Sequence, residues 1–327
     1  MSRLRRAALA GALASLLSSC GPSPAALTPL GPGAARIVGL FELFLVVLAV
    51  PAAITIGLLV LAAVRRRDDA ARPASLAWIV FGTLVTVVVL VVLLVASVRV
   101  GAEVARPPGP TAVTIDVRGH QFWWEVRYPD LRISTANEIH IPAGRPVRLR
   151  LTSADVIHNF WVPELHGKMD MVPGHTNIFW IQADHPGRFV GRCAEFCGVQ
   201  HALMAVIVVA EPQESFDAWA AAQRAPAAAP VDAEARRGLE VYLGAACGHC
   251  HAIGGVTPPL ETGAVGPDLT HLASRGTLAA ATLANNRGNL AGWILNPHDH
   301  KPGSRMPASS LTPGDLMALL SYLEGLR

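Results

Sequence analysis

The stretch Cys193-Ala-Glu-Phe-Cys197-Gly-Val-Gln-His201-Ala-Leu-Met204 places two thiols, an imidazole and a thioether within twelve residues. Soft sulfur ligands combined with imidazole favour copper over hard cations. Thiols four positions apart on one loop can bridge a pair of copper ions, and each ion then needs its own terminal imidazole. His201 supplies one of them, so the pattern predicts a two-copper site with a second histidine from upstream.

The segment Ser153-Ala-Asp-Val-Ile-His158-Asn-Phe-Trp-Val-Pro163 supplies that histidine. His158 follows the alternating apolar residues Val147, Leu149 and Leu151, a pattern typical of a half-buried strand. We therefore predict that His158 is the second terminal ligand.

Two other interpretations compete for Cys193 and Cys197. They could form a small disulfide loop in an exported protein, or they could hold a structural zinc ion. Neither interpretation gives a role to Glu195 or Met204, and copper is favoured for that reason.

A second metal motif is Cys247-Gly-His-Cys250-His251. The spacing C-x-x-C-H is typical of covalent attachment of a c-type haem, with the two thiols bonded to the porphyrin and His251 as an axial ligand of the iron. A thioredoxin-like redox pair is the alternative, but it requires a βαβ context and leaves the adjacent histidine without a role.

The opposite face of a c-type haem usually carries a methionine sulfur. Met306 is the candidate, because it lies in a loop rich in proline and glycine before the last predicted helix. Met317, His298 and His300 are its rivals. Met317 falls in the apolar period of the C-terminal helix, so we expect it to pack in the core.

The chain has 327 residues, 34.5 kDa and a mean hydropathy of +0.38, which indicates a membrane protein with about two further domains. The uncharged runs 43–64 and 73–98 are each long enough to span a bilayer as a helix. The arginine-rich loop 65–72 between them favours the cytoplasmic side, which puts everything after Val98 outside. The net charge of +3 is set largely by such arginines, and no nucleic-acid motif is present.

The N-terminus has arginines, an apolar stretch and then Leu17-Ser-Ser-Cys20, the layout of a bacterial lipoprotein signal. This resemblance implies that the Cys20 thiol is lipidated and that the peptide preceding Cys20 is removed. The five cysteines are then all assigned, one to lipid, two to copper and two to haem, and none remains for a disulfide.

The predicted fold class is a multi-domain membrane protein: a two-helix transmembrane hairpin, an all-β cupredoxin-like sandwich and an all-α class I cytochrome c domain. Alternating strands, a low-complexity Ala/Pro tether and a helical C-terminal pattern set the divisions. The predicted parts are a signal peptide (1–19), an extracytoplasmic segment (20–36), a first transmembrane helix (37–64), a cytoplasmic loop (65–73), a second transmembrane helix (74–98), the cupredoxin domain (111–212), a linker (213–230) and the cytochrome c domain (231–327).

These motifs together resemble subunit II of haem-copper cytochrome c oxidases, in the caa3-type form that carries a cytochrome c behind the dinuclear CuA domain. The pattern Cys-x-Glu-x-Cys-x3-His-x2-Met is matched at each fixed position. The resemblance implies that Cys193 and Cys197 bridge the copper ions and that His158 and His201 are the terminal ligands. It also implies that Met204 is a weak axial ligand and that Glu195 contributes its backbone carbonyl. It also implies that Pro267 packs against His251.

The same resemblance implies partners and a membrane location. The partners would be a catalytic subunit I with haem a and CuB, subunit III and a soluble periplasmic donor such as a cytochrome c. The location would be the bacterial inner membrane, with both metal domains outside, and Glu195 would share a magnesium ion with subunit I. Proton translocation coupled to O2 reduction would follow. A CuA-containing nitric oxide reductase and a membrane-anchored carrier without an oxidase partner are the alternatives.

Two positions depart from the family pattern. Gly119-His-Gln-Phe-Trp-Trp124 has Phe122 where the family has a tryptophan through which electrons enter, so that role falls on Phe122 or Trp123. Ser75-Leu-Ala-Trp78 lacks the carboxylate that the family often has near a proton channel. Proton pumping and the identity of the donor therefore stay open.

Overall fold

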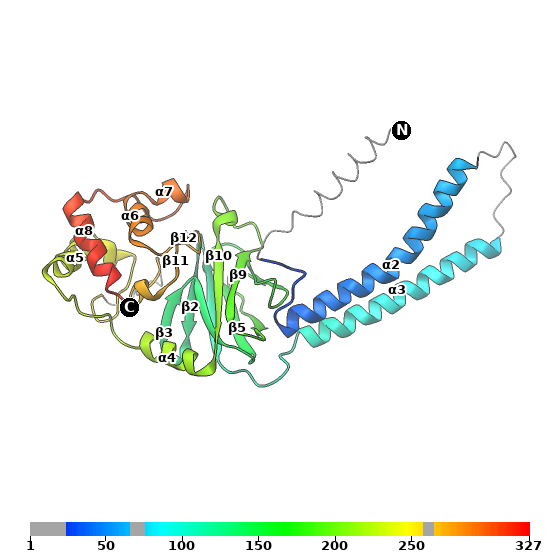
Figure 1. The fold of residues 1–327 in the computed structure, drawn as a ribbon, viewed down its shortest axis with the longest axis horizontal. Coiled ribbons are helices and arrows are strands. Elements are labelled where there is room, and N and C mark those ends of the chain that lie inside the picture. Colours follow the sequence, from blue (N-terminus) through cyan, green and yellow to red (C-terminus); the bar gives the residue numbers. More distant parts are fainter. Residues whose placement is uncertain (1–23, 66–75, 258–264) are drawn as a thin grey trace, which may run out of the picture.

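The computed structural model describes residues 24–65, 76–257 and 265–327. Two long helices, a β-sandwich and a small helical domain follow one another along the molecule, with the helical domain at the end remote from the long helices (Figure 1). This is the predicted fold class. The predicted signal peptide, Cys20 and nearly all of the predicted cytoplasmic loop lie outside the described residues.

Helices α2 (Pro32–Val64) and α3 (Leu76–Val104) lie side by side and project away from the sandwich (Figure 1). Both are long and apolar enough to cross a membrane, and their large apolar side chains are mostly exposed. Such exposed apolar surface is expected of helices that lipid surrounds. α2 begins before residue 37 and α3 continues past residue 98, so both extend beyond the predicted spans.

The sandwich has two five-stranded sheets, with strand orders β3-β2-β1-β5-β8 and β4-β10-β9-β6-β7. Side chains alternate along β5, where Val147, Leu149 and Leu151 are fully buried. The strands are β1 (Thr114–His120), β2 (Trp123–Tyr128), β3 (Ile133–Ala136), β4 (Glu138–Pro142), β5 (Val147–Ser153), β6 (His158–Trp161), β7 (Lys168–Met171), β8 (Asn177–Ile181), β9 (Gly187–Cys193) and β10 (Ala205–Glu211). Short 3-10 helices, η1 (Pro129–Leu131) and η2 (His201–Leu203), interrupt the connections.

Part of the predicted linker is a helix, α4 (Gln213–Gln223). Phe216 and Ala220 are buried, and the Trp219 ring stacks on the His140 imidazole with ring centroids 4.2 Å apart. Apolar residues at helical spacing thus pack this segment onto the sandwich. The predicted linker 213–230 therefore begins with a helix that packs on the sandwich.

The C-terminal domain is helical, with one two-stranded sheet among its described residues. Its elements are α5 (Ala233–Gly244), η3 (Cys247–His249), η4 (Leu272–Ser274), β11 (Thr277–Leu278), β12 (Leu283–Ala284), α6 (Arg287–Leu295), α7 (Pro297–His300) and α8 (Pro313–Glu324). The side chains of Asp232 and Thr312 cap α5 and α8. A Cβ atom on Gly238 would lie 2.0 Å from the Ala318 carbonyl oxygen, so glycine allows these two helices to cross closely.

Candidate metal centres

The first candidate centre lies at one end of the sandwich. His158 is the first residue of β6 and Cys193 is the last of β9, and the loop from β9 to β10 carries the remaining predicted ligands. The Cys193 amide donates to the Met204 carbonyl at 2.9 Å, which closes this loop. The Ala194 amide donates to the Asn159 carbonyl at 3.1 Å and fixes the loop to β6.

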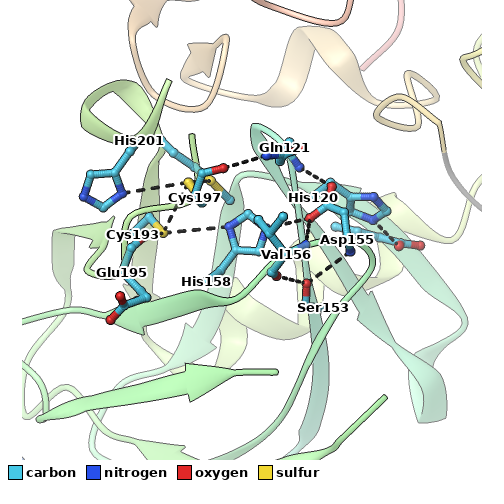
Figure 2. Close-up of polar contacts among 12 residues, drawn as sticks. His120, Gln121, Ser153, Asp155, Val156, His158, Cys193, Glu195, Cys197 and His201 are labelled. Atoms are coloured by element: carbon cyan, nitrogen blue, oxygen red, sulfur yellow. Dashed lines mark hydrogen bonds and ion pairs between the residues drawn. The ribbon is translucent and has the colours of Figure 1, made fainter. Parts of the chain in front are cut away.

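The side chains meet around two sulfur atoms (Figure 2). The Sγ atoms of Cys193 and Cys197 are 3.8 Å apart, and the Nδ1 atoms of His158 and His201 each lie 3.8 Å from one of them, His158 from Cys193 and His201 from Cys197. Met204 Sδ is 3.8 Å from the Cys197 sulfur. The structure thus brings the predicted ligands together, and copper binding by them stays a prediction.

Glu195 contributes its backbone at this centre. Its carbonyl oxygen is 3.2 Å from the Cys193 sulfur, whereas its carboxylate points away from the sulfur pair (Figure 2). The ligand atoms of His158, Cys193 and Cys197 all lie within 4.8 Å of one another, which is compact enough for a metal ion to bind them together. Donors of sulfur and imidazole fit copper in this arrangement.

The two thiols of this centre are free and buried. Their 3.8 Å separation is far beyond the ~2 Å of a disulfide bond, so the disulfide interpretation does not hold. The hydrogen bond from Cys197 and the neighbouring His158 lower the pKa of Cys193 to about 3. The Cys193 sulfur and burial in turn raise the pKa of Cys197. Two thiolates so close together are stable only when cations compensate their charge.

Sequence reasoning missed Asp155. Its carboxylate accepts a hydrogen bond from His158 Nε2 at 2.9 Å, which leaves Nδ1 facing the sulfur of Cys193. Burial lowers the pKa of His158, but Asp155 and Cys193 outweigh it and raise the pKa above its ordinary value. A carboxylate on the far nitrogen of a ligand histidine is a recurring outer contact of metal sites, and an acid three residues before the histidine is its only signal in the sequence.

Phe122 and Trp123 lie in different surroundings. Ring atoms of Phe122 lie 3.1 Å from where a Cβ of Gly198 would stand, which places the ring against the loop between Cys197 and His201. Trp123 instead stacks on His120 with ring centroids 4.4 Å apart. Phe122, one of the two predicted points of electron input, is therefore in contact with the metal-site loop.

The second candidate centre surrounds η3. Cys247 and Cys250 are free and partly exposed, and the next residue, His251, directs Nδ1 to the Pro267 carbonyl oxygen at 2.7 Å. Donation from Nδ1 leaves the lone pair on Nε2, the nitrogen that can bind iron. Burial lowers the pKa of His251, which favours the neutral ligand form. These residues fit a covalently attached haem, and Pro267 meets His251 as the resemblance implied.

Met306 lies half-buried in the loop between α7 and α8, and its role as the second axial ligand stays a prediction. Its rival Met317 is 45% exposed on α8, so the expectation that Met317 packs in the core was wrong. α8 buries its neighbours Leu319, Leu320 and Leu323 instead.

Fold and sites together define a protein class: a β-sandwich with a sulfur- and imidazole-rich centre, fused to a haem-type domain and carrying two apolar helices. Residues 131–211 match the family described as cytochrome c oxidase subunit II, periplasmic domain, and residues 235–327 match cytochrome c. Cytochrome c oxidase subunit 2 of Alkalihalophilus pseudofirmus is 36% identical over 92% of this chain and 90% of its own length. The chain belongs to the cytochrome c oxidase subunit II family and carries a cytochrome c domain.

A second relative agrees with this assignment. Cytochrome c oxidase subunit 2 of Bacillus sp. strain PS3 is 32% identical over 75% of this chain and 73% of its own length. Among solved structures, the periplasmic domain of subunit II of cytochrome oxidase from Bradyrhizobium japonicum is 30% identical, covering 36% of this chain and 96% of that one, with a TM-score of 0.35. The family implies copper and haem as cofactors and association with other oxidase subunits.

Proposed function

We propose that this chain is the electron-input subunit of a haem-copper oxidase, with a dinuclear copper centre held by His158, Cys193, Cys197, His201, Met204 and the carbonyl of Glu195. The observation that carries the proposal is the pair of free sulfurs 3.8 Å apart with one imidazole nitrogen directed at each. Copper bound there supplies a one-electron carrier whose charge is shared over two ions.

The protein's own residues prepare this centre for electron transfer. Asp155 fixes the His158 ring, and the backbone bonds around Cys193 fix the loop, so the ligands rearrange little between oxidation states. On the other domain, Cys247 and Cys250 would bond the haem, with His251 and Met306 as axial ligands. A haem of this kind carries electrons from a periplasmic donor to the copper centre.

The two apolar helices support a place in the bacterial inner membrane, with both metal domains on the periplasmic side. A lipid on Cys20 would already anchor the protein to the membrane, so two further spanning helices suit packing against other oxidase subunits. These subunits would be subunit I, with haem a and CuB, and subunit III. The carboxylate of Glu195 is exposed and turned away from the sulfurs, a position from which it could share a magnesium ion with subunit I. Reduction of O2, coupled to proton translocation, would occur in the partner.

The test is to purify the complex from native membranes through this subunit, determine copper per chain and record the reduced-minus-oxidised optical spectrum. We expect two copper ions and one c-type haem on this chain, and haem a in the partner. A b-type haem alone would favour a nitric oxide reductase, and no second haem would leave a membrane-anchored carrier. Loss of copper but not of haem in Cys197→Ser, and of haem but not of copper in Cys250→Ser, would assign the two sites.

A further inference from the structure

The C-terminal domain lies against the sandwich on the side remote from α2 and α3 (Figure 1). The Thr282 hydroxyl donates to the Leu203 carbonyl at 3.2 Å, and the Ala205 amide donates to the Ala280 carbonyl at 3.2 Å. These two contacts fall on either side of Met204. The haem domain therefore touches the loop that carries the predicted copper ligands.

A buried carboxylate joins the two domains. Glu138, at the start of β4, is only 2% exposed, and it accepts hydrogen bonds from the Gly276 amide at 3.2 Å and the Thr277 hydroxyl at 2.9 Å. Within the sandwich, its carboxylate pairs with Arg188 at 3.3 Å. A buried carboxylate without hydrogen-bond donors is unfavourable, so the haem domain supplies contacts that Glu138 needs.

The loop before Met306 is held just as closely. Lys301 is 2% exposed and donates to the carbonyls of Phe122 at 3.3 Å and Ala279 at 3.2 Å. Gly303 has a φ of +85°, and a Cβ there would lie 2.6 Å from Val199 Cγ2. Only glycine combines that backbone conformation with so close an approach to the copper loop.

A hydrogen-bonded route crosses this interface. The Arg305 guanidinium donates to the side-chain oxygen of Gln121. The side-chain nitrogen of Gln121, Nε2, in turn donates to the backbone carbonyl of Cys197 at 2.6 Å. Arg305 precedes Met306 in the chain, so covalent bonds and two hydrogen bonds link the predicted haem ligand to a predicted bridging cysteine.

We propose that the contact between Arg305 and Gln121 carries electrons from the haem to the copper centre, and that Glu138 and Lys301 are positioning residues that hold the haem domain in place for this transfer. This inference rests on the function proposed above. The step moves one electron from ferrous haem iron, which becomes ferric, to the oxidised copper pair, which is reduced by one electron. No bond forms or breaks and no proton moves.

The first experiment compares Arg305→Ala and Arg305→Lys with Arg237→Ala. Arg237 is an arginine of the same domain that pairs with Glu240 and Asp315 and not with the sandwich. In the purified complex, the haem is photoreduced and the appearance of reduced copper is timed. We expect Arg305→Ala to slow transfer roughly tenfold or more, the scale of loss for outer contacts of metal sites. Arg305→Lys should restore part of the rate, and Arg237→Ala should not change it.

Two further measurements separate conduction from docking. The optical bands of the copper pair and of the methionine–iron bond must be unchanged in Arg305→Ala, and hydrogen–deuterium exchange at the Gly276 and Ala205 amides must stay at the wild-type level. A wild-type transfer rate in Arg305→Ala would overturn the proposed route. A slow rate accompanied by lost amide protection would also overturn it, because Arg305 would then act by holding the domain in place and not by carrying electrons. Wild-type protein without copper or haem would contradict the proposed function itself.

The docking of the haem domain, to which Glu138 and the close approach at Gly303 both contribute, is tested without relying on electron transfer. Glu138→Ala should raise exchange at the Gly276 amide in protein with and without copper, whereas Asp116→Ala, which removes a surface ion pair of the same sandwich, should not. Gly303→Ala should raise exchange at the Ala205 amide. Gly255→Ala is the control and should not raise it, because Gly255 also has a positive φ, +84°, but an added Cβ there would meet only an ordinary contact 3.5 Å away. Unchanged protection in both Glu138→Ala and Gly303→Ala would show that these residues do not hold the domain.

Discussion

The carboxylate of Asp155 lies 2.9 Å from Nε2 of His158, a side chain with no exposed surface. One ring nitrogen of His158 is therefore committed to the carboxylate and the other faces a sulfur. The backbone amide of Gln121 also donates to the Asp155 carboxylate, at 2.7 Å, so the carboxylate is itself fixed in place. Asp155 thus sets both the tautomer and the orientation of a predicted copper ligand.

Replacing Asp155 with asparagine should weaken copper binding while the sandwich stays folded. We expect a loss of affinity of about 10–100-fold, the range for outer-shell partners of metal ligands. Competition against a copper chelator measures it. Asp116→Asn is the control, because Asp116 pairs with Arg150 on the surface. Equal affinities for the two variants would mean that Asp155 does not support the site.

A small residue beneath the His158 ring gives a second prediction. A Cβ on Gly119 would lie 2.7 Å from His158 Cδ2, too close for the ring to keep its position. Gly119→Ala should therefore displace the ligand, alter the copper absorption bands and cost about 1–3 kcal/mol of stability, as overpacking does. Gly109→Ala is the control, because no atom lies within 4 Å of the Cβ it would add. Unaltered bands in Gly119→Ala would contradict the close packing of this ring against β1.

How far sequence reasoning reached differs between parts of the site. Cys193, Cys197, His201 and Met204 lie within twelve residues, so their spacing was enough to group them, whereas the role of the Glu195 carbonyl came from the family resemblance. Asp155 escaped notice because its role depends on where the His158 ring points. Glu138 is a longer-range case, since its partners Gly276 and Thr277 lie in another domain and no local pattern marks them. The helix α4 was missed because the alanine-rich composition masked the apolar spacing of Phe216, Trp219 and Ala220.

His166 makes stability depend on pH at the junction between the sandwich and the apolar helices. Burial and the charge of Arg36 lower its pKa, the Val104 backbone opposes them, and the net result is a pKa of about 4. The unfolded chain binds a proton below pH 6.5 while the folded chain does not, so stability is present above pH 6.5 and is lost as the pH falls towards 4. At 1.36 kcal/mol per pKa unit, the loss is about 3 kcal/mol.

Denaturant unfolding in detergent, followed between pH 7 and pH 4, tests this expectation. The wild-type chain should lose about 3 kcal/mol more than His166→Phe, because phenylalanine cannot take up the proton. The other titrating groups are common to both proteins and cancel in the difference. Parallel pH profiles for the two proteins would show that His166 does not carry this dependence.

The last prediction concerns the sixth ligand of the haem. Met306→Leu should abolish the methionine–iron charge-transfer band and lower the haem reduction potential by roughly 0.1–0.3 V, a part of the ~0.8 V over which axial ligands set haem potentials. Met317→Leu is the matched control, because Met317 is 45% exposed on α8 and should leave both quantities unchanged. A band that survives Met306→Leu and disappears in Met317→Leu would reassign the ligand to Met317. A wild-type haem that lacks the band altogether would favour His298 or His300, since a histidine ligand in place of methionine gives bis-histidine coordination and a lower potential.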